Sequence, residues 1–239
     1  MNLAKPRVDI GLATNDIAPM LAFWQGEAGI PFDHLLKVRR GHAQHRHDAL
    51  GSVLKINHQE TPIIDAPPSG YLELLVAREG LAEPKPLQDP EGNRVTLVPP
   101  SFEGVTQIGI RMGVRSLEAH RKFYSEALGL TEEPRPTGAA FRAGETLILL
   151  DESPDAPSDA GMAGRGWRYI TFQIFKVDEE HAQVLAAGGR EAMPPTTLGT
   201  TARISMVRDP DGNWIELSQR ASLVGAIQPT FFQSLTYFQ

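Results

Sequence analysis

Short runs in which hydrophobic and polar residues alternate cover most of this chain, and such a period of two is typical of β-strands with one buried face. Helical stretches are fewer. The predicted helices span residues 18–27, 117–128 and 179–187. The predicted strands span residues 8–14, 33–47, 51–58, 71–77, 94–98, 106–112, 139–142, 146–150, 169–175, 202–208 and 214–218.

Capping residues mark where the helices begin and end. Asp16 is a suitable N-cap for the first helix, in which Pro19 falls within the first turn, where proline is tolerated. Ser116 is a suitable N-cap for the second helix, and Gly129 fits the left-handed residue that ends it. Gly188 begins the glycine pair that ends the third helix. These boundaries define a unit of one strand, one helix and three strands.

The sequence contains an internal repeat. Residues 209–217 read Asp-Pro-Asp-Gly-Asn-Trp-Ile-Glu-Leu, and residues 89–97 read Asp-Pro-Glu-Gly-Asn-Arg-Val-Thr-Leu. Another fragment recurs in the same order, as Ile-Gly-Leu at 10–12 and Ile-Gly-Ile at 108–110, each time before a helical run that ends in two aromatic residues. Matched fragments in a shared order indicate that the chain arose by duplication.

The two halves differ in length, because the first is about twenty residues shorter between its matched fragments. The missing residues belong after the strand at 71–77, where no amphipathic helix follows. Residues 99–104 interrupt the periodic pattern and mark the joint between the halves. We therefore expect an N-terminal domain at 1–102, a C-terminal domain at 103–220 and a tail at 221–239.

Composition narrows the range of functions. The chain has 239 residues, 41% of them hydrophobic, as in globular domains. Its formal net charge is −6 and it has no run of Lys and Arg, so we expect a small-molecule partner and no nucleic acid. The chain has no cysteine, so any metal would be bound by His, carboxylate, amide or phenol groups.

The sequence shows no targeting or membrane signal. The first residues lack the apolar core of a signal peptide, and no stretch approaches the roughly 20 apolar residues of a membrane span. We therefore expect a cytoplasmic protein that does not bind a membrane.

Residues 108–130, 169–187 and 209–217 together resemble the vicinal oxygen chelate superfamily. This group includes glyoxalases, extradiol dioxygenases, epimerases and bleomycin-resistance proteins. The resemblance implies an α+β fold in which tandem βαβββ modules form two cup-shaped half-barrel domains. Four modules are expected, two in each domain, and the second lacks its helix. They fall near residues 6–60, 68–99, 104–152 and 166–220.

In this family the first and last strands of each module supply the ligands of a divalent metal inside the cup. The matching positions here are Asp9, Lys55, Tyr71, Thr96, Gln107, Leu149, Tyr169 and Glu216. The family's dioxygenases use two histidines and one glutamate, and here both histidine positions are replaced. The resemblance therefore implies a metal site at Glu216 and Gln107 for Mn, Ni, Fe or Zn, and the missing histidines leave open that no metal is bound.

Glu216 is the leading catalytic candidate. A carboxylate on the last strand can bind a cation or remove a proton next to a carbonyl, although the position also suits a solvated glutamate. Tyr169 is a second catalytic candidate, since its hydroxyl can coordinate a metal or donate a hydrogen bond to an oxyanion. The alternative for Tyr169 is that it only fills the cup.

A histidine-rich segment at residues 41–48 supplies two more catalytic candidates. An extended conformation puts His45 and His47 on one face of the strand, and Gln44 and Arg46 on the other. Histidine is the commonest metal ligand and carries protons near neutral pH, so His45 and His47 can replace the missing ligands. The alternative is a solvated hairpin.

Three basic residues in the same region are predicted to bind the substrate. Arg46 lies within the histidine-rich segment, and Lys55 and His58 lie in the following strand. Together they can hold an anionic group such as a carboxylate or a phosphate.

Three functions remain open on this evidence. We expect foremost a metal-dependent lyase or isomerase that acts on a small oxygenated substrate, in which the metal polarises the substrate and a base removes a proton. The alternative is a metal-free protein of the bleomycin-resistance type that sequesters a ligand. The third is an extradiol ring-cleavage dioxygenase with His45 or His47 as an iron ligand.

Two segments outside the modules carry further expectations. Residues 151–165 are rich in Ser, Pro, Asp and Gly, so they predict an exposed loop that can close over a ligand. The tail contains four aromatic residues, which predict docking on its own subunit or a homodimer, unless the tail is a non-native extension. These residues are Phe231, Phe232, Tyr237 and Phe238.

Overall fold

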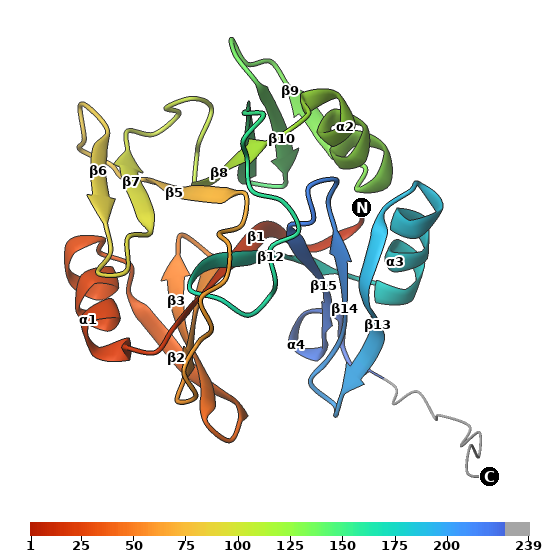
Figure 1. Cartoon of the computed structure of the whole chain (residues 1–239), viewed down its shortest axis with the longest axis horizontal. Helices are drawn as coiled ribbons and strands as arrows, with labels where there is room; N and C mark the ends of the chain where they lie inside the picture. The colour runs from red at the N-terminus through yellow and green to blue at the C-terminus, as the bar shows by residue number, and fades with distance from the viewer. Residues whose placement is uncertain (228–239) are drawn as a thin grey trace.

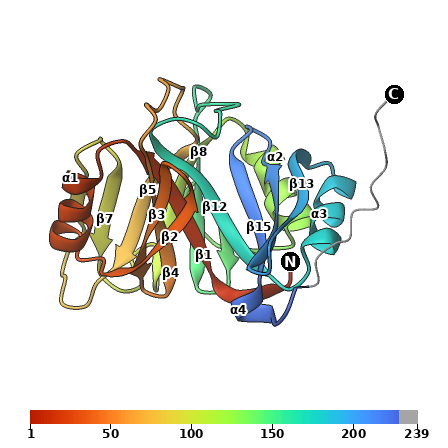
Figure 2. The same ribbon diagram turned by 90° about the horizontal axis from the view of Figure 1, so that it is seen from below.

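A computed structural model describes residues 1–227, which form two β-sheets that share one hydrophobic core (Figures 1 and 2). Helix α1 (Ile17–Ala22) lies at one side of the molecule, and helices α2 (Leu117–Lys122) and α3 (Val177–Ala186) lie at the other. The α+β class predicted from the sequence is confirmed. The four aromatic residues of the tail, which were predicted to dock on the subunit or on a second copy, lie outside the described residues.

The first sheet has eight strands in the order β13-β14-β15-β12-β1-β4-β3-β2 and curls into a half-barrel. At its centre β1 pairs antiparallel with β12, and each of these strands pairs parallel with the last strand of its own module, β4 or β15. Its strands are β1 (Leu3–Thr14), β2 (Phe32–Arg39), β3 (His42–Ala49), β4 (Ser52–Gln59), β12 (Gly166–Ile174), β13 (Arg190–Leu198), β14 (Ala202–Arg208) and β15 (Trp214–Arg220).

The second sheet has seven strands in the order β6-β7-β5-β8-β11-β10-β9. It follows the same scheme, since β5 and β8 pair antiparallel at the centre and each pairs parallel with the last strand of its module, β7 or β11. Its strands are β5 (Tyr71–Ala77), β6 (Lys85–Gln88), β7 (Arg94–Val98), β8 (Ile108–Val114), β9 (Thr131–Glu133), β10 (Ala139–Ala143) and β11 (Thr146–Glu152).

The strand order shows how the four modules combine. The first and last modules share the eight-stranded sheet, and the two middle modules share the seven-stranded sheet. We expected neighbouring modules to pair with each other, the first two within residues 1–102 and the last two within residues 103–220. The strand order differs from this expectation. The reason is that module order does not dictate which first strands meet, and here β1 meets β12 on the far side of the chain.

The helices lie close to their predicted positions. The first two continue into a wider turn, η1 (Phe23–Glu27) and η2 (Phe123–Ala127), and a fourth short helix, α4 (Ala221–Val224), follows β15. The hydroxyl of Ser116 accepts a hydrogen bond from the backbone N–H of Ala119 at 3.3 Å, as predicted for an N-cap. Between β5 and β6 the described chain forms no helix, so the second module lacks one as expected.

Alternation along the central strands separates the two faces of the first sheet. Ile10, Leu54 and Ile56 are fully buried, and they belong to the core cluster that contains Trp24 of η1. Residues between them in sequence, such as Lys55, point to the opposite face. The helices therefore cover one face of the sheet, and the polar positions line the other.

The predicted strand at 33–47 is in fact two strands. β2 ends at Arg39 and β3 begins at His42, with a turn at Gly41, whose φ of 70° is in the left-handed region. Glycine adopts such a φ without a steric cost, and this turn allows β2 to fold back on β3. The alternating pattern on both sides of Gly41 concealed the break.

Candidate functional site

The concave face of the eight-stranded sheet lines a cavity of about 430 Å³. Its walls are mainly apolar, whereas side chains from the central strands form a polar base. Met162, in the loop between β11 and β12, also lines the cavity, so the loop predicted at 151–165 reaches the ligand space. The apolar wall includes Leu36, Val38, Leu198, Ile204 and Met206.

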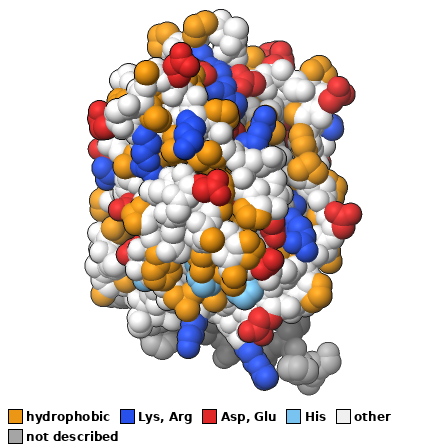
Figure 3. Space-filling view, turned by 90° about the vertical axis from the view of Figure 1, so that its left-hand side faces the viewer, with side chains coloured by type: hydrophobic (Ala, Val, Ile, Leu, Met, Phe, Trp, Pro, Cys, Tyr) orange, Lys and Arg blue, Asp and Glu red, His pale blue; other side chains and the backbone are white. Residues whose placement is uncertain are grey.

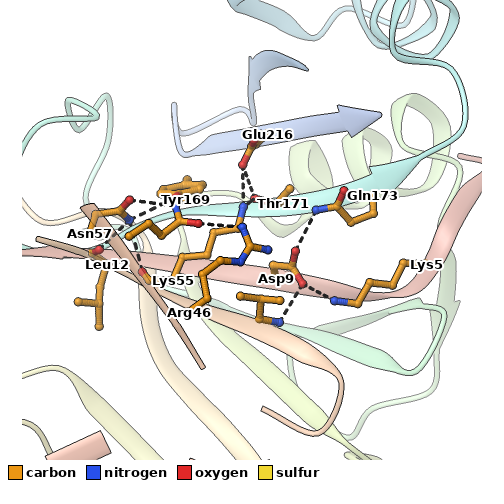
Figure 4. Close-up of polar contacts among 12 residues, drawn as sticks. Lys5, Asp9, Leu12, Arg46, Lys55, Asn57, Tyr169, Thr171, Gln173 and Glu216 are labelled. Carbon is orange, nitrogen blue, oxygen red and sulfur yellow. Dashed lines mark hydrogen bonds and ion pairs between the residues drawn. The ribbon is translucent and has the colours of Figure 1, made fainter. Parts of the chain in front are cut away.

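The strand register assembles the polar base. Arg46 of β3 lies opposite Lys55 of β4. In β12, Thr171 lies between Asp9 of β1 and Glu216 of β15. Five strands, three from the first module and two from the last, thus place charged and polar side chains on one side of the sheet (Figure 4).

A three-membered cluster occupies the centre of this base. The ammonium of Lys55 donates to Oε2 of Glu216 at 2.8 Å and to Oγ1 of Thr171 at 2.6 Å. The hydroxyl of Thr171 in turn donates to the same carboxylate oxygen at 2.6 Å. The side chains of Lys55 and Glu216 are 3% and 12% exposed, so this is a buried ion pair.

The carboxylates of the base are ionised at neutral pH. Burial raises the pKa of Glu216, but the charge of Lys55 and the hydrogen bonds from Lys55 and Thr171 outweigh burial, and the pKa lies below its usual value. Burial likewise opposes ionisation of Asp9, yet the charges of Lys55 and Lys5 lower its pKa overall. Asp9 accepts a hydrogen bond from Lys5 at 2.8 Å.

Tyr169 presents a neutral phenol to the cavity. Burial and the nearby charge of Glu216 raise the pKa of Tyr169 above its usual value. Its oxygen accepts hydrogen bonds from the side-chain amides of Gln44 at 3.3 Å and Asn57 at 3.2 Å. Because both amides donate to it, the phenol proton is free to be donated to an oxygen of a ligand.

These residues do not fit a divalent metal. Within residues 1–227 no three His, Asp or Glu side chains are close enough to hold a metal ion. Lys55 stands at the position that the family resemblance assigns to a ligand on β4, and it binds the carboxylate of Glu216. A metal at Glu216 would be repelled by the adjacent ammonium, because like charges at such distances interact strongly in a buried site.

The structure does not bring Gln107 to Glu216. Gln107 precedes β8 in the seven-stranded sheet, where its carbonyl accepts a hydrogen bond from Ala77, whereas Glu216 lies in the eight-stranded sheet. The predicted metal site of Glu216 with Gln107 is therefore not assembled. The reason is the module pairing, since β15 shares its sheet with β1 and not with β8.

The concave face of the seven-stranded sheet carries a different set of residues. A small apolar cluster lies on it beside a cavity of about 470 Å³, and the cluster is formed by Leu75, Val98, Val105, Ala140, Leu147 and Leu149. Next to this cluster Arg111 forms ion pairs with Glu73 at 3.0 Å, Glu103 at 2.9 Å and Asp151 at 3.1 Å. Of the family positions in this sheet, Leu149 belongs to the apolar cluster and Thr96 donates a hydrogen bond to Glu73. The candidate site therefore lies in the first sheet.

The histidine candidates lie on the other face of the first sheet. As predicted, His45 and His47 share one face of β3, but they pair with Ile56 and Leu54 of β4, which face the core. His58 is on the same face, with its ring centroid 6.2 Å from that of His45. The space-filling view of the side that carries α1 shows histidine and hydrophobic side chains together (Figure 3).

His47 should make stability fall in mild acid. It is fully buried, its ring nitrogens have no hydrogen-bond partner among the described residues 1–227, and burial lowers its pKa. The imidazole of the unfolded chain therefore takes up a proton near pH 6.5, whereas that of the folded chain does so only at lower pH. The free energy of unfolding consequently falls as the pH drops from 6.5 towards the pKa of His47 in the folded state.

Replacing His47 by leucine is expected to remove this contribution, which is at most about 1.4 kcal/mol per pH unit. Urea unfolding of the wild type and His47→Leu at pH 7 and pH 5 measures it. Equal losses of stability between the two pH values in both proteins would contradict this interpretation.

Several residues of the base were not identified from the sequence. Gln44, Asn57 and Thr171 were not proposed as site residues, and Arg220, which lines the cavity, was also missed. A signal was present, because Asn57 and Thr171 are polar positions that alternate with buried apolar residues in central strands. When such polar residues alternate with apolar ones in a central strand whose two faces are both shielded from water, they indicate a polar cavity on one face of the sheet.

Comparisons with known proteins agree with this architecture. Residues 106–217 match the model of the Glyoxalase/Bleomycin resistance protein/Dioxygenase superfamily. That segment belongs to this superfamily, and the resemblance predicted from the sequence is confirmed. A comparison with curated proteins finds no match.

Solved structures extend the likeness to nearly the whole chain. Glyoxalase I from Zea mays has a TM-score of 0.71 at 15% identity and covers 89% of this chain and 92% of its own. A putative dioxygenase from Bacillus subtilis has a TM-score of 0.66 at 11% identity, with coverages of 92% and 85%. The chain therefore has the two-sheet fold of these proteins. In the described part no helix is long and apolar enough to span a membrane.

Proposed function

We propose that this chain binds a small molecule in the cup of the eight-stranded sheet without a divalent metal. The observation that carries the proposal is the buried contact of Lys55 with Glu216 and Thr171, which puts a positive charge of the chain itself where the family resemblance implies a metal. Of the functions considered from the sequence, this corresponds to the ligand-sequestering alternative of the bleomycin-resistance type.

The cavity supports a ligand with a largely apolar body and an oxygen-containing group. A volume of about 430 Å³ lies within the range of small-molecule sites. Leu36, Ile204 and Met206 offer an apolar surface, and Tyr169 offers a phenol proton beside the amide of Asn57. Such sites gain affinity from apolar burial and orientation from a few polar groups.

The metal-dependent lyase or isomerase and the ring-cleavage dioxygenase are less well supported. Both require several ligands around one ion, and Glu216 has neither Gln107 nor His45 or His47 beside it on this face. A carboxylate bound to Lys55 is also a weaker base than a free one, because transfer of a proton to it breaks an ion pair.

Ligand binding after metal removal tests the proposal. Protein dialysed against a chelator is expected to bind naphthylacetamide, a neutral apolar probe, with unchanged affinity by calorimetry. Ile204→Trp should fill the cup and abolish binding, whereas Leu223→Trp, at an exposed position outside the cup, should retain it.

Two results would reject the proposal. One is binding that appears only after addition of Mn²⁺, Ni²⁺, Fe²⁺ or Zn²⁺. The other is one equivalent of metal in protein purified without chelator that is lost on Glu216→Gln.

A further inference from the structure

Two arginines at the base of the cup lack the anionic partner that buried cations normally have. Arg46 is only 5% exposed, and its hydrogen bond runs from Nη1 to Oε1 of Gln44 at 2.9 Å. Arg220, the last residue of β15, is half-buried and lines the cavity, whereas Arg46 lies directly behind the lining residues Gln44 and Lys55. The Nε atoms of both arginines are buried without a partner, and within residues 1–227 neither arginine forms an ion pair.

The nearby carboxylates are already engaged by other cations. Glu216 pairs with Lys55 at 2.8 Å, and Asp9 pairs with Lys5 at 2.8 Å. The base of the cup therefore contains two matched ion pairs beside the guanidinium groups of Arg46 and Arg220. Arg168, which also lines the cavity, donates to backbone carbonyls, among them that of Pro67 at 2.8 Å. In Figure 4 the Arg46 side chain extends across the concave face towards Lys55 and Thr171.

The two guanidinium groups are close enough to repel one another. Burial lowers the pKa of Arg46, and the positive charge of Arg220 lowers it further, while Asp9 and Glu216 oppose this in part. An unpaired buried charge destabilises a fold, and a ligand of opposite charge that binds the folded state offsets that cost.

We propose that the ligand of this cup is a carboxylic acid with an apolar body, whose carboxylate is bound between Arg46 and Arg220. This inference rests on the proposed function and names the chemical class of its ligand. The carboxylate would supply the missing negative charge, and the planar guanidinium groups match its two oxygens.

The surroundings favour a carboxylate over a more highly charged group. Leu198 and Ile204 border the cavity, so the body of the ligand must be apolar. A phosphate monoester carries almost two charges near neutral pH and loses more hydration on entering such a site than a carboxylate does. The phenol of Tyr169 can donate its proton to the second carboxylate oxygen.

The test compares three probes with the same body: naphthylacetate, naphthylacetamide and naphthyl phosphate. The acid and the amide have nearly the same shape, so their difference in affinity isolates the charge. At pH 7 the full-length protein is expected to bind the acid about 10–100-fold more tightly than the amide, as for hydrogen bonds to charged groups. The phosphate should bind more weakly than the acid.

Variants locate the effect. Arg46→Met and Arg220→Met should each reduce affinity for the acid to near that of the amide, whereas Arg121→Met, at an exposed pair with Glu132, should change neither. Without ligand, Arg46→Met is also expected to raise the melting temperature by about 2–4 °C, because it removes an unpaired buried charge. This readout shows that the variant folds.

The outcomes separate the two proposals. Equal affinity of acid and amide in the wild type, or a preference for the acid that survives both arginine substitutions, would overturn the carboxylate site while leaving the cup as a binding site. Tighter binding of the phosphate would replace the carboxylate by another anion class and overturn this inference. Failure of all three probes to bind would reject the proposed function and this inference together.

Discussion

Replacing Lys55 by methionine is expected to lower the free energy of unfolding by about 3–5 kcal/mol, because it leaves the carboxylate of Glu216 buried without its cation. The pair is 2.8 Å apart, and both side chains are largely shielded from water. Methionine retains most of the volume of lysine, so the loss reports the charge more than a cavity. Urea unfolding followed by circular dichroism measures it.

Two controls identify the origin of this loss. Adding Glu216→Leu to Lys55→Met should restore most of the stability, since removal of both partners of a buried pair is often neutral. Lys176→Met should cost less than about 1 kcal/mol, because Lys176 pairs with Glu179 on the surface, where both side chains are more than half exposed. A double variant as unstable as Lys55→Met would show that Lys55 does not act through Glu216.

Replacing Asp209 by alanine is expected to lower the free energy of unfolding by about 3 kcal/mol. Its carboxylate accepts hydrogen bonds from the backbone N–H and the side-chain amide of Asn213, both at 2.8 Å, and lies 3.4 Å from Nε2 of the buried His120. Burial lowers the pKa of His120, but Asp209 and Asp211 outweigh burial and raise it overall. The substitution therefore breaks a turn and also removes the partner of a buried imidazole.

The repeat supplies a matched control for this prediction. Asp89 makes the same turn, accepting from the backbone N–H of Asn93 at 2.9 Å and from its side-chain amide at 2.8 Å, and among residues 1–227 it has no ion pair with a histidine such as that of Asp209 with His120. Asp89→Ala should therefore cost about 2 kcal/mol, less than Asp209→Ala. Equal losses in urea unfolding would mean that His120 contributes nothing to the second turn.

The repeat also explains why so much of the fold was predictable. The turns at Asp89 and Asp209 use local hydrogen bonds between a carboxylate and an asparagine four residues later, so they form wherever those residues occur. Strand alternation and helix caps such as Ser116 are equally local. The four modules, their helices and the loss of one helix therefore follow from short-range patterns.

The site was predicted only in part. Glu216, Lys55, Tyr169 and Arg46 were named from the family positions and the basic cluster, and all four lie at the base of the same cup. Their mutual contacts were not foreseen. In particular, Lys55 was expected to bind the substrate, whereas it is engaged with Glu216 and Thr171.

The candidates His45, His47 and Gln107 do not contact Glu216, and the reason is tertiary packing, which the local sequence does not show. His45 and His47 were correctly placed on one face of a strand, but the packing of Leu54 and Ile56 against α1 and η1 made that face the core side. Gln107 lies beside the other sheet, because β8 pairs with β5. A period of two identifies two faces without saying which of them is concave.

By itself the sequence determined the number of modules and the positions of their strands and turns. These properties depend on residues close together in the chain. Only the tertiary structure decided that the first module joins the last, that Lys55 meets Glu216 and that Arg46 of β3 and Arg220 of β15 belong to the same half-barrel. Such contacts span more than a hundred residues, and they arise from the packing of whole sheets, which no local pattern encodes.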